Sequence, residues 1–164
     1  MPDSTTTSVI PATSEAEIRA AQDMLFFAYR DFTHAADVVL AELGLGRAHH
    51  RAMHFIARTP GLPVSELLAI LRITKQSLAR VLNELVARDY VAQIQGRSDR
   101  RQRLLRLTIA GQALERRLYG RQRDRIAAAY DAEPAAVEGF RRIMRGITDD
   151  SAREYMDAAE GAAR

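Results

Sequence analysis

The sequence of 164 residues contains no cysteine, no long apolar run and no extended block of a single charge sign. Without cysteine, the chain cannot form disulfides, thiolate zinc sites, iron–sulfur clusters or a thiol redox switch. Because no apolar run is long enough to cross a bilayer, we expect no membrane partner. Residues 1–13 carry neither a basic leader nor a continuous apolar stretch, so we predict a disordered tail there and a cytoplasmic protein.

The composition that is present is typical of one ordered domain, with 47% hydrophobic and 27% charged residues. The net charge of +3 is unevenly distributed along the chain. Residues 1–46 hold seven acidic and two basic residues, whereas residues 72–106 hold nine basic and three acidic residues. Positive charge is therefore concentrated in the middle of the chain, where a phosphate backbone could neutralise it.

Apolar residues recur every three or four positions from Ser14 to Leu43, which predicts a long amphipathic helix. Further helices are predicted over residues 47–58, over about two turns from Val64, and after an N-cap at Thr74. Only three residues separate the third and fourth helices. This spacing indicates a tight helix-turn-helix.

Two short β-compatible segments, 90–95 and 102–108, flank a charged stretch and predict a β-hairpin. A helix to about Tyr130 follows, and one final helix is predicted from Pro134 to about Glu160. The predicted fold class is therefore mainly α with a small β-hairpin wing, an α+β arrangement of the winged helix-turn-helix type.

The fourth helix has an exposed face opposite its apolar stripe, because residues four apart share a face. That face carries Lys75, Gln76, Ala79, Arg80 and Asn83. Gln and Asn can bind adenine, Arg and Lys can bind guanine, and a small Ala can approach a thymine methyl. An ordinary solvated helix face is the alternative interpretation.

The predicted hairpin tip, 96–103, places four arginines around Asp99. A tip of this length can enter a minor groove, whose negative potential attracts arginine. A purely solvated polar turn is the alternative.

Three stretches together resemble the MarR family of bacterial regulators: PGLPVSEL at 60–67, ITKQSLAR at 73–80, and Asp-Arg-Arg at 99–101 followed by Leu107-Thr108 and Gly111. The resemblance is strongest over residues 48–112. It implies an obligate homodimer joined through the first and last helices, with recognition helices in successive major grooves and wings in minor grooves. It also implies that Arg101 enters the minor groove and that Asp99 holds the wing through an ion pair with a nearby arginine.

With this resemblance, the chain divides into the tail, a dimerisation helix at 14–46, a DNA-binding lobe at 47–108 and C-terminal dimerisation helices at 109–164. The predicted function is sequence-specific regulation of transcription, as a repressor that binds a pseudo-palindromic operator in double-stranded DNA. The residues predicted to contact DNA are Thr74, Lys75, Gln76, Ser77, Arg80, Asn83, Arg97, Asp99, Arg100 and Arg101.

The resemblance further implies a small aromatic or phenolic effector bound between the dimerisation helices and the winged lobe. The candidate residues, on the first and second helices, are Tyr29, Arg30, Phe32, Thr33, His34, Met53 and His54.

Two histidines of the second helix, His50 and His54, are four residues apart and could share a metal ion. No glutamate follows His50 and no cysteine is available as a third ligand, so we favour a packing role and predict no metal, no cofactor and no enzymatic activity. Two alternative functions are a winged-helix module that contacts protein or RNA, and a metal-dependent enzyme that uses these histidines.

Overall fold

The computed structural model describes residues 13–162, so the tail predicted at 1–13 lies outside the described residues except for Thr13. The elements run in the order α1 (Glu15–Glu42), α2 (Arg47–Arg58), β1 (Leu62–Pro63), α3 (Val64–Leu71), α4 (Lys75–Ala87), β2 (Val91–Gln95), β3 (Arg103–Leu107), α5 (Ile109–Ala132), the 3₁₀ turn η1 (Pro134–Ala136), α6 (Val137–Ile147) and α7 (Asp150–Ala162). The fold is mainly helical with one small antiparallel sheet, as the sequence predicts.

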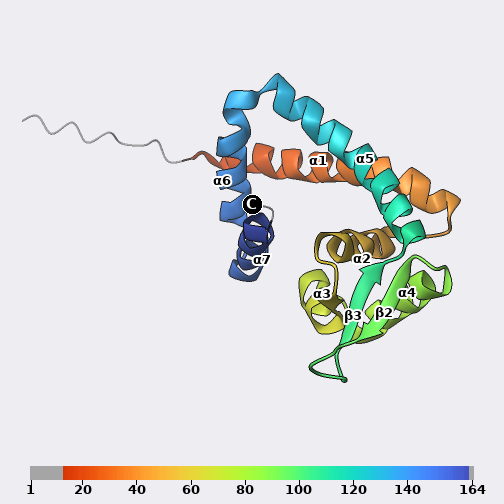
Figure 1. Ribbon diagram of the computed structural model, residues 1–164. Helices are drawn as coiled ribbons and strands as arrows, with labels where there is room; N and C mark the ends of the chain where they lie inside the picture. Colours follow the sequence, from red (N-terminus) through yellow and green to blue (C-terminus); the bar gives the residue numbers. More distant parts are fainter. Residues whose placement is uncertain (1–12, 163–164) are drawn as a thin grey trace, which may run out of the picture.

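The structure consists of a compact lobe and of long helices that extend from it (Figure 1). In the lobe, α2, α3 and α4 pack with the sheet, while α1 and α5 extend away from it and α6 and α7 turn back. The core lies in the lobe and includes only the C-terminal half of α1 and the first half of α5. Its largest fully buried side chains are Leu40, Met53, Ile56, Leu62, Leu67, Leu78, Leu85, Leu105 and Leu118.

The helix-turn-helix consists of α3 and α4 with a three-residue turn between them. Arg72 ends α3 in the left-handed region, with φ 51° and ψ 40°. Thr74 then caps α4, because the main-chain N–H of Ser77 donates to the Thr74 hydroxyl oxygen at 3.1 Å. The predicted turn and the predicted cap are both present.

The predicted hairpin is present as β2 and β3, with Val91 opposite Leu107 and Gln95 opposite Arg103. The structure adds a third strand, because β1 pairs with the outer edge of β3 through Leu62 and Leu105. The sequence pattern did not predict this strand. A two-residue strand is too short to give a period-2 pattern of its own.

The prediction of one final helix was wrong, because the chain breaks between α6 and α7. Thr148 is extended, with ψ 155°, and the Asp149 carboxylate accepts from the main-chain N–H of Ala152 at 2.9 Å and from the Ser151 hydroxyl at 2.8 Å. Such local side-chain bonds compete with the helical ladder. None of the helices between residues 13 and 162 combines the length and the hydropathy that a membrane-spanning segment requires.

Candidate nucleic-acid interface and effector cleft

One face of α4 packs into the lobe and the opposite face is exposed. Leu78, Val81, Leu82 and Leu85 are buried in the core. On the exposed face, the side chains predicted to read bases are Lys75, Gln76, Ala79, Arg80 and Asn83. The structure therefore brings these residues together on one solvent-facing surface of α4.

Two further residues predicted to contact DNA, Thr74 and Ser77, are bonded to each other. The Thr74 hydroxyl donates to the Ser77 hydroxyl oxygen at 2.9 Å, in addition to accepting from the Ser77 main chain. Their first role is thus to fix the start of α4. The Ser77 hydroxyl still has its own hydrogen available for a phosphate oxygen.

The wing extends from the lobe as the tip of the β2–β3 hairpin (Figure 1). The tip is closed by the main-chain N–H of Gly96, which donates to the Gln102 carbonyl at 3.0 Å. A side chain at Gly96 would collide with the carbonyl oxygen of Asp99, because an added Cβ would lie 2.6 Å from it. Glycine is therefore required for this tight closure.

Asp99 holds the wing through the main chain. Its carboxylate accepts from the main-chain N–H of Arg101 at 2.9 Å, and within residues 13–162 it forms no ion pair. The ion pair with an arginine that the resemblance implied is thus replaced by a bond that leaves the guanidinium groups free. The exposed arginines of the wing are Arg97, Arg100, Arg101 and Arg103.

The basic side chains of α4 and of the wing share one electrostatic property. In the described part of the chain, neither Lys75 nor Arg80 nor any of the four wing arginines lies within ion-pair distance of an acidic side chain. Six cations without acidic partners therefore project from adjacent elements. Such a surface favours a polyanion.

A cleft of about 360 Å³ lies between α1 and α2, and Ile70 and Leu71 of α3 and Gln122 of α5 also line it. Four of the residues predicted to bind an effector line it, namely Tyr29, Phe32, Thr33 and His54. The Thr33 hydroxyl donates to the carbonyl groups of its own helix, 2.9 Å from that of Tyr29. Its oxygen can therefore act toward a ligand only as an acceptor.

The other three predicted effector residues lie away from this cleft. Met53 is completely buried in the core, His34 is exposed, and Arg30 pairs with Asp31 at 2.8 Å. The Arg30 guanidinium also lies 4.8 Å from the centre of the Phe27 ring. The cation predicted to bind the effector is therefore engaged outside the cleft.

The cations that do line the cleft come from α2. Arg47 pairs with Asp37 at 2.6 Å, and this hydrogen bond lowers the pKa of the Asp37 carboxyl. Arg51 instead donates to the Tyr29 hydroxyl oxygen at 2.5 Å and has no acidic partner within residues 13–162. Arg51 therefore supplies the uncompensated positive charge of the cleft.

Two of the three histidines of α2, His50 and His54, are mainly neutral at pH 7. Burial lowers the pKa of His54 to about 4, with Arg58 and His50 acting in the same direction. Burial also lowers the pKa of His50, against the opposing effect of Asp37. Among the described residues, no group of three or more His, Asp or Glu side chains is placed to hold a metal ion.

Comparison with known proteins identifies the family. The profile of the MarR family matches residues 43–102. The HTH-type transcriptional regulator PetP of Rhodobacter capsulatus is 44% identical over 150 residues, which cover 91% of this chain and 90% of the relative. The chain belongs to the MarR family of winged helix-turn-helix transcriptional regulators.

Solved structures of MarR-type proteins share the fold at low sequence identity. A SlyA-like transcription regulator from Listeria monocytogenes is 18% identical, with a TM-score of 0.66 over 85% of this chain and 93% of that one. NadR, solved in complex with 4-hydroxyphenylacetate, is also 18% identical, with a TM-score of 0.67 over 84% of this chain and 97% of that one. These likenesses support the fold of this MarR-family chain over most of its length.

Sequence reasoning missed several cleft residues of this MarR-family protein, although two signals could have indicated them. Arg47 and Arg51 are four residues apart on α2, so they share a helix face with His54. Gln122 continues the buried stripe of Leu114 and Leu118 on α5 at the same spacing. A polar residue in a buried stripe is expected to have a hydrogen-bond partner. The Gln122 amide has one, because it donates to the Phe32 carbonyl at 3.4 Å.

Proposed function

We propose that this protein binds duplex DNA as a homodimer, with α4 in the major groove and the wing in the minor groove. The observation that carries this proposal is the set of six cations on α4 and the wing that have no acidic partner among residues 13–162, beside exposed Gln76 and Asn83. Phosphates would be neutralised by the cations, while the amides and Arg80 would contact base edges. This role would place the protein in the cytosol.

The homodimer is supported by apolar surface that a single chain leaves uncovered. Large side chains on the N-terminal half of α1 and on α6 are exposed, including Phe26 at 64% and Ile143 at 68%. An apolar hollow of about 680 Å³ also lies between α1, α5 and α6. A second copy that inserts its own helices there would cover both features and place two copies of α4 on one operator.

Modulation by an aromatic anion is supported by the cleft between α1 and α2. It combines the rings of Tyr29 and Phe32 with the uncompensated charge of Arg51. The related fold of NadR binds 4-hydroxyphenylacetate, a phenol with one carboxylate. A ligand of this class would be held between α1 and the lobe. It could therefore change the distance between the two copies of α4 in the dimer and release the operator, as expected for a ligand-responsive repressor.

Selection of bound sequences from random duplexes tests the DNA proposal. A pseudo-palindromic consensus is expected, and Gln76→Ala should lose about 1–3 kcal/mol of preference at one base pair of each half-site. Gln112→Ala, which changes an exposed glutamine on α5, is the matched control. Equal binding to all duplexes, or tighter binding to single-stranded RNA, would contradict the proposal.

Titration with 4-hydroxyphenylacetate tests the effector proposal separately. The ligand should weaken operator binding by the same factor by which operator binding weakens ligand binding. Arg51→Gln should reduce ligand affinity, whereas Arg116→Gln on the exposed face of α5 should not. Unchanged ligand affinity in Arg51→Gln would show that the anion is not bound in this cleft.

A further inference from the structure

Both ends of α4 are connected by charged side chains to helices outside the helix-turn-helix. Arg88 is the C-cap residue of α4, and its guanidinium donates at 2.5 Å to the carbonyl of Leu43, the C-cap residue of α1. At the other end, Arg72 in the turn before α4 pairs with Asp149 in the turn before α7. The direction of α4 is therefore tied to α1 at one end and to α7 at the other.

The contact with α1 belongs to a cluster of three side chains, His49, Glu84 and Arg88, which we call the α1 cluster. One carboxylate oxygen of Glu84 accepts from the Arg88 guanidinium at 2.7 Å, and the other lies 2.8 Å from Nε2 of His49 on α2. Nδ1 of His49 accepts from the main-chain N–H of Gly46 at 3.1 Å. Because Nδ1 is an acceptor here, the ring hydrogen is on Nε2 and is donated to Glu84.

The α1 cluster encloses the turn between α1 and α2, residues 43–46. Arg88 binds the carbonyl group at the start of this turn, and His49 binds the N–H group at its end. The His49 side chain is only 14% exposed, so its bond to Glu84 is largely shielded from water. This hydrogen bond lowers the pKa of the Glu84 carboxyl and thereby favours the charged form that Arg88 requires.

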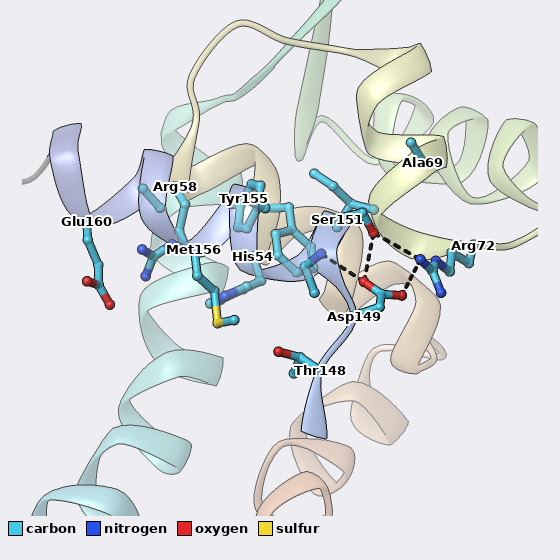
Figure 2. A pocket seen from close by; sticks show the side chains of 14 residues that line it. His54, Arg58, Ala69, Arg72, Thr148, Asp149, Ser151, Tyr155, Met156 and Glu160 are labelled. Carbon is cyan, nitrogen blue, oxygen red and sulfur yellow. Dashed lines mark hydrogen bonds and ion pairs between the residues drawn. The ribbon is translucent and has the colours of Figure 1, made fainter. Parts of the chain in front are cut away.

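Figure 2 shows the contact at the other end of α4, which we call the α7 cluster and which consists of Arg72, Asp149 and Ser151. The Arg72 guanidinium lies 2.5 Å from the Asp149 carboxylate and donates to the Ser151 hydroxyl oxygen at 2.9 Å. On α7, the Tyr155 ring packs edge-to-face on Phe55 of α2, with 5.3 Å between the ring centres. The turn that leads into α4 is thus held by the segment that leads into α7.

The two clusters do not use the side chains that we propose to contact bases, Lys75, Gln76, Arg80 and Asn83. In a two-fold dimer, the direction of α4 relative to the dimerisation helices determines the distance and the rotation between the two half-sites that are contacted. Adding one base pair between half-sites rotates one of them by about 35° and moves it by about 3.4 Å. A rigidly held α4 would therefore discriminate against such a change.

We propose that the α1 and α7 clusters consist of positioning residues that determine which half-site spacing the dimer accepts. Their side chains would fix the angle between α4 and the dimerisation helices and would leave the choice of bases to the exposed face of α4. This inference rests on the proposed function, because it requires a DNA-binding dimer. It adds to that function a determinant of operator specificity outside the base-contacting surface.

Binding to duplexes with altered half-site spacing tests the inference. The selected consensus is compared with versions in which the half-sites are one base pair closer or farther apart, and the wild type should prefer the selected spacing by about tenfold or more. His49→Asn, Arg88→Gln and Arg72→Gln should each reduce this preference to about threefold, while base preferences within a half-site stay unchanged. The ratio of two affinities cancels the effect of a lost charge on overall DNA affinity.

Two substitutions of His49 separate the two hydrogen bonds of its ring. A glutamine amide reaches the position of Nε2 and can still donate to Glu84, whereas an asparagine reaches only the position of Nδ1. His49→Gln should therefore keep the wild-type spacing preference that His49→Asn loses. The matched control for Arg88→Gln is Arg117→Gln, which removes the same charge from α5 and breaks an ion pair with Glu42 near the end of α1. This control should keep the wild-type preference.

A distance measurement without DNA tests the clusters on the protein alone. Because the chain has no cysteine, spin labels can be attached at His34→Cys on α1 and Gln76→Cys on α4, two exposed positions, with the labelled chains diluted in unlabelled protein. Double electron–electron resonance should give one narrow distance distribution in the wild-type background. Arg88→Gln and His49→Asn should broaden it.

The outcomes distinguish this inference from the proposed function. Equal spacing preferences and equal label distances in wild type, Arg88→Gln and His49→Asn would overturn the inference, even if the protein bound a pseudo-palindrome tightly. A loss in Arg117→Gln as large as in Arg88→Gln would also overturn it, because the effect would then come from charge near the turn. Failure of the wild type to bind duplex DNA would contradict the proposed function and with it the role in half-site spacing.

Discussion

Gly111 is the residue whose substitution should most clearly disturb the junction between α4 and the wing. It occupies the third position of α5, where an added Cβ would lie 1.9 Å from the carbonyl oxygen of Tyr90 and 2.9 Å from its carbonyl carbon. Tyr90 lies in the turn between α4 and β2. The obstacle is main chain, so no side-chain rotation can relieve the collision, and Gly111→Ala must push α5 away from this turn.

The expected loss of stability follows from the hydrogen bonds that this displacement breaks. The main-chain N–H of Thr108 donates to the Tyr90 carbonyl at 3.1 Å, and the Thr108 hydroxyl donates to the Asp89 carbonyl at 2.5 Å. Overpacking costs about 1–3 kcal/mol, and each lost hydrogen bond adds about 0.5–1.5 kcal/mol. We therefore expect Gly111→Ala to lower the free energy of unfolding by about 3 kcal/mol or more.

Thermal unfolding at a fixed protomer concentration measures this effect, because the stability of a homodimer depends on concentration. A loss of about 3 kcal/mol corresponds to a fall of roughly 6–12 °C in the melting temperature for a chain of this size. The matched control is Gly120→Ala in the same helix, where an added Cβ meets no atom within 4 Å. The control should be neutral or stabilising by up to about 1 kcal/mol. Equal melting temperatures for the two variants would refute the reasoning.

Three further predictions follow from the wing, the histidines and the exposed apolar surface. Arg101→Ala should weaken binding to most duplexes and reduce the slope of log affinity against log salt by about 1, as measured by anisotropy; an unchanged slope would remove Arg101 from the phosphate contacts. Because the pKa of His54 is lowered to about 4 in the folded protein, protonation favours the unfolded chain, so stability should fall as pH drops from about 6.5 toward 4, by up to about 3 kcal/mol. His54→Gln should flatten this loss between pH 6.5 and 5, and His34→Gln, at an exposed position, should not. Ile143→Glu on α6 should raise the dimer dissociation constant by about tenfold or more in sedimentation, whereas Ile109→Glu, which is 86% exposed at the start of α5, should leave it unchanged.

The elements that the sequence predicts well are those specified by local rules. The periodic apolar residues from Ser14 onward predict the long helix α1, and the structure begins that helix with a capping box formed by Ser14 and Glu17. The three-residue turn before α4 and the hairpin follow in the same way from spacing and from turn residues. Gly111 shows the boundary of this approach: its place in the sequence motif is visible, but the reason for it is a main-chain contact with Tyr90, 21 residues away along the chain.

The break between α6 and α7 could not be predicted from periodicity, because apolar residues continue on both sides of it. Asp149 fixes the break locally, but its carboxylate also pairs with Arg72 in the turn before α4. A pairing between residues so distant along the chain depends on the path of three intervening helices, which no local pattern encodes.

Helical periodicity identifies the buried face of α2 but not that of α1. On α2, Ala52, Met53 and Ile56 form the buried stripe, so the period assigns Met53 to the core and leaves Arg51 and His54 on the other side. On α1 the same rule fails, because Leu25, Phe26 and Phe27 are consecutive and occupy more than half of the circumference. A helix that is apolar on most sides has to be covered on most sides. One chain covers only the C-terminal half of α1, so the orientation of its N-terminal half would depend on the second copy that we propose, whose contacts a single sequence does not contain.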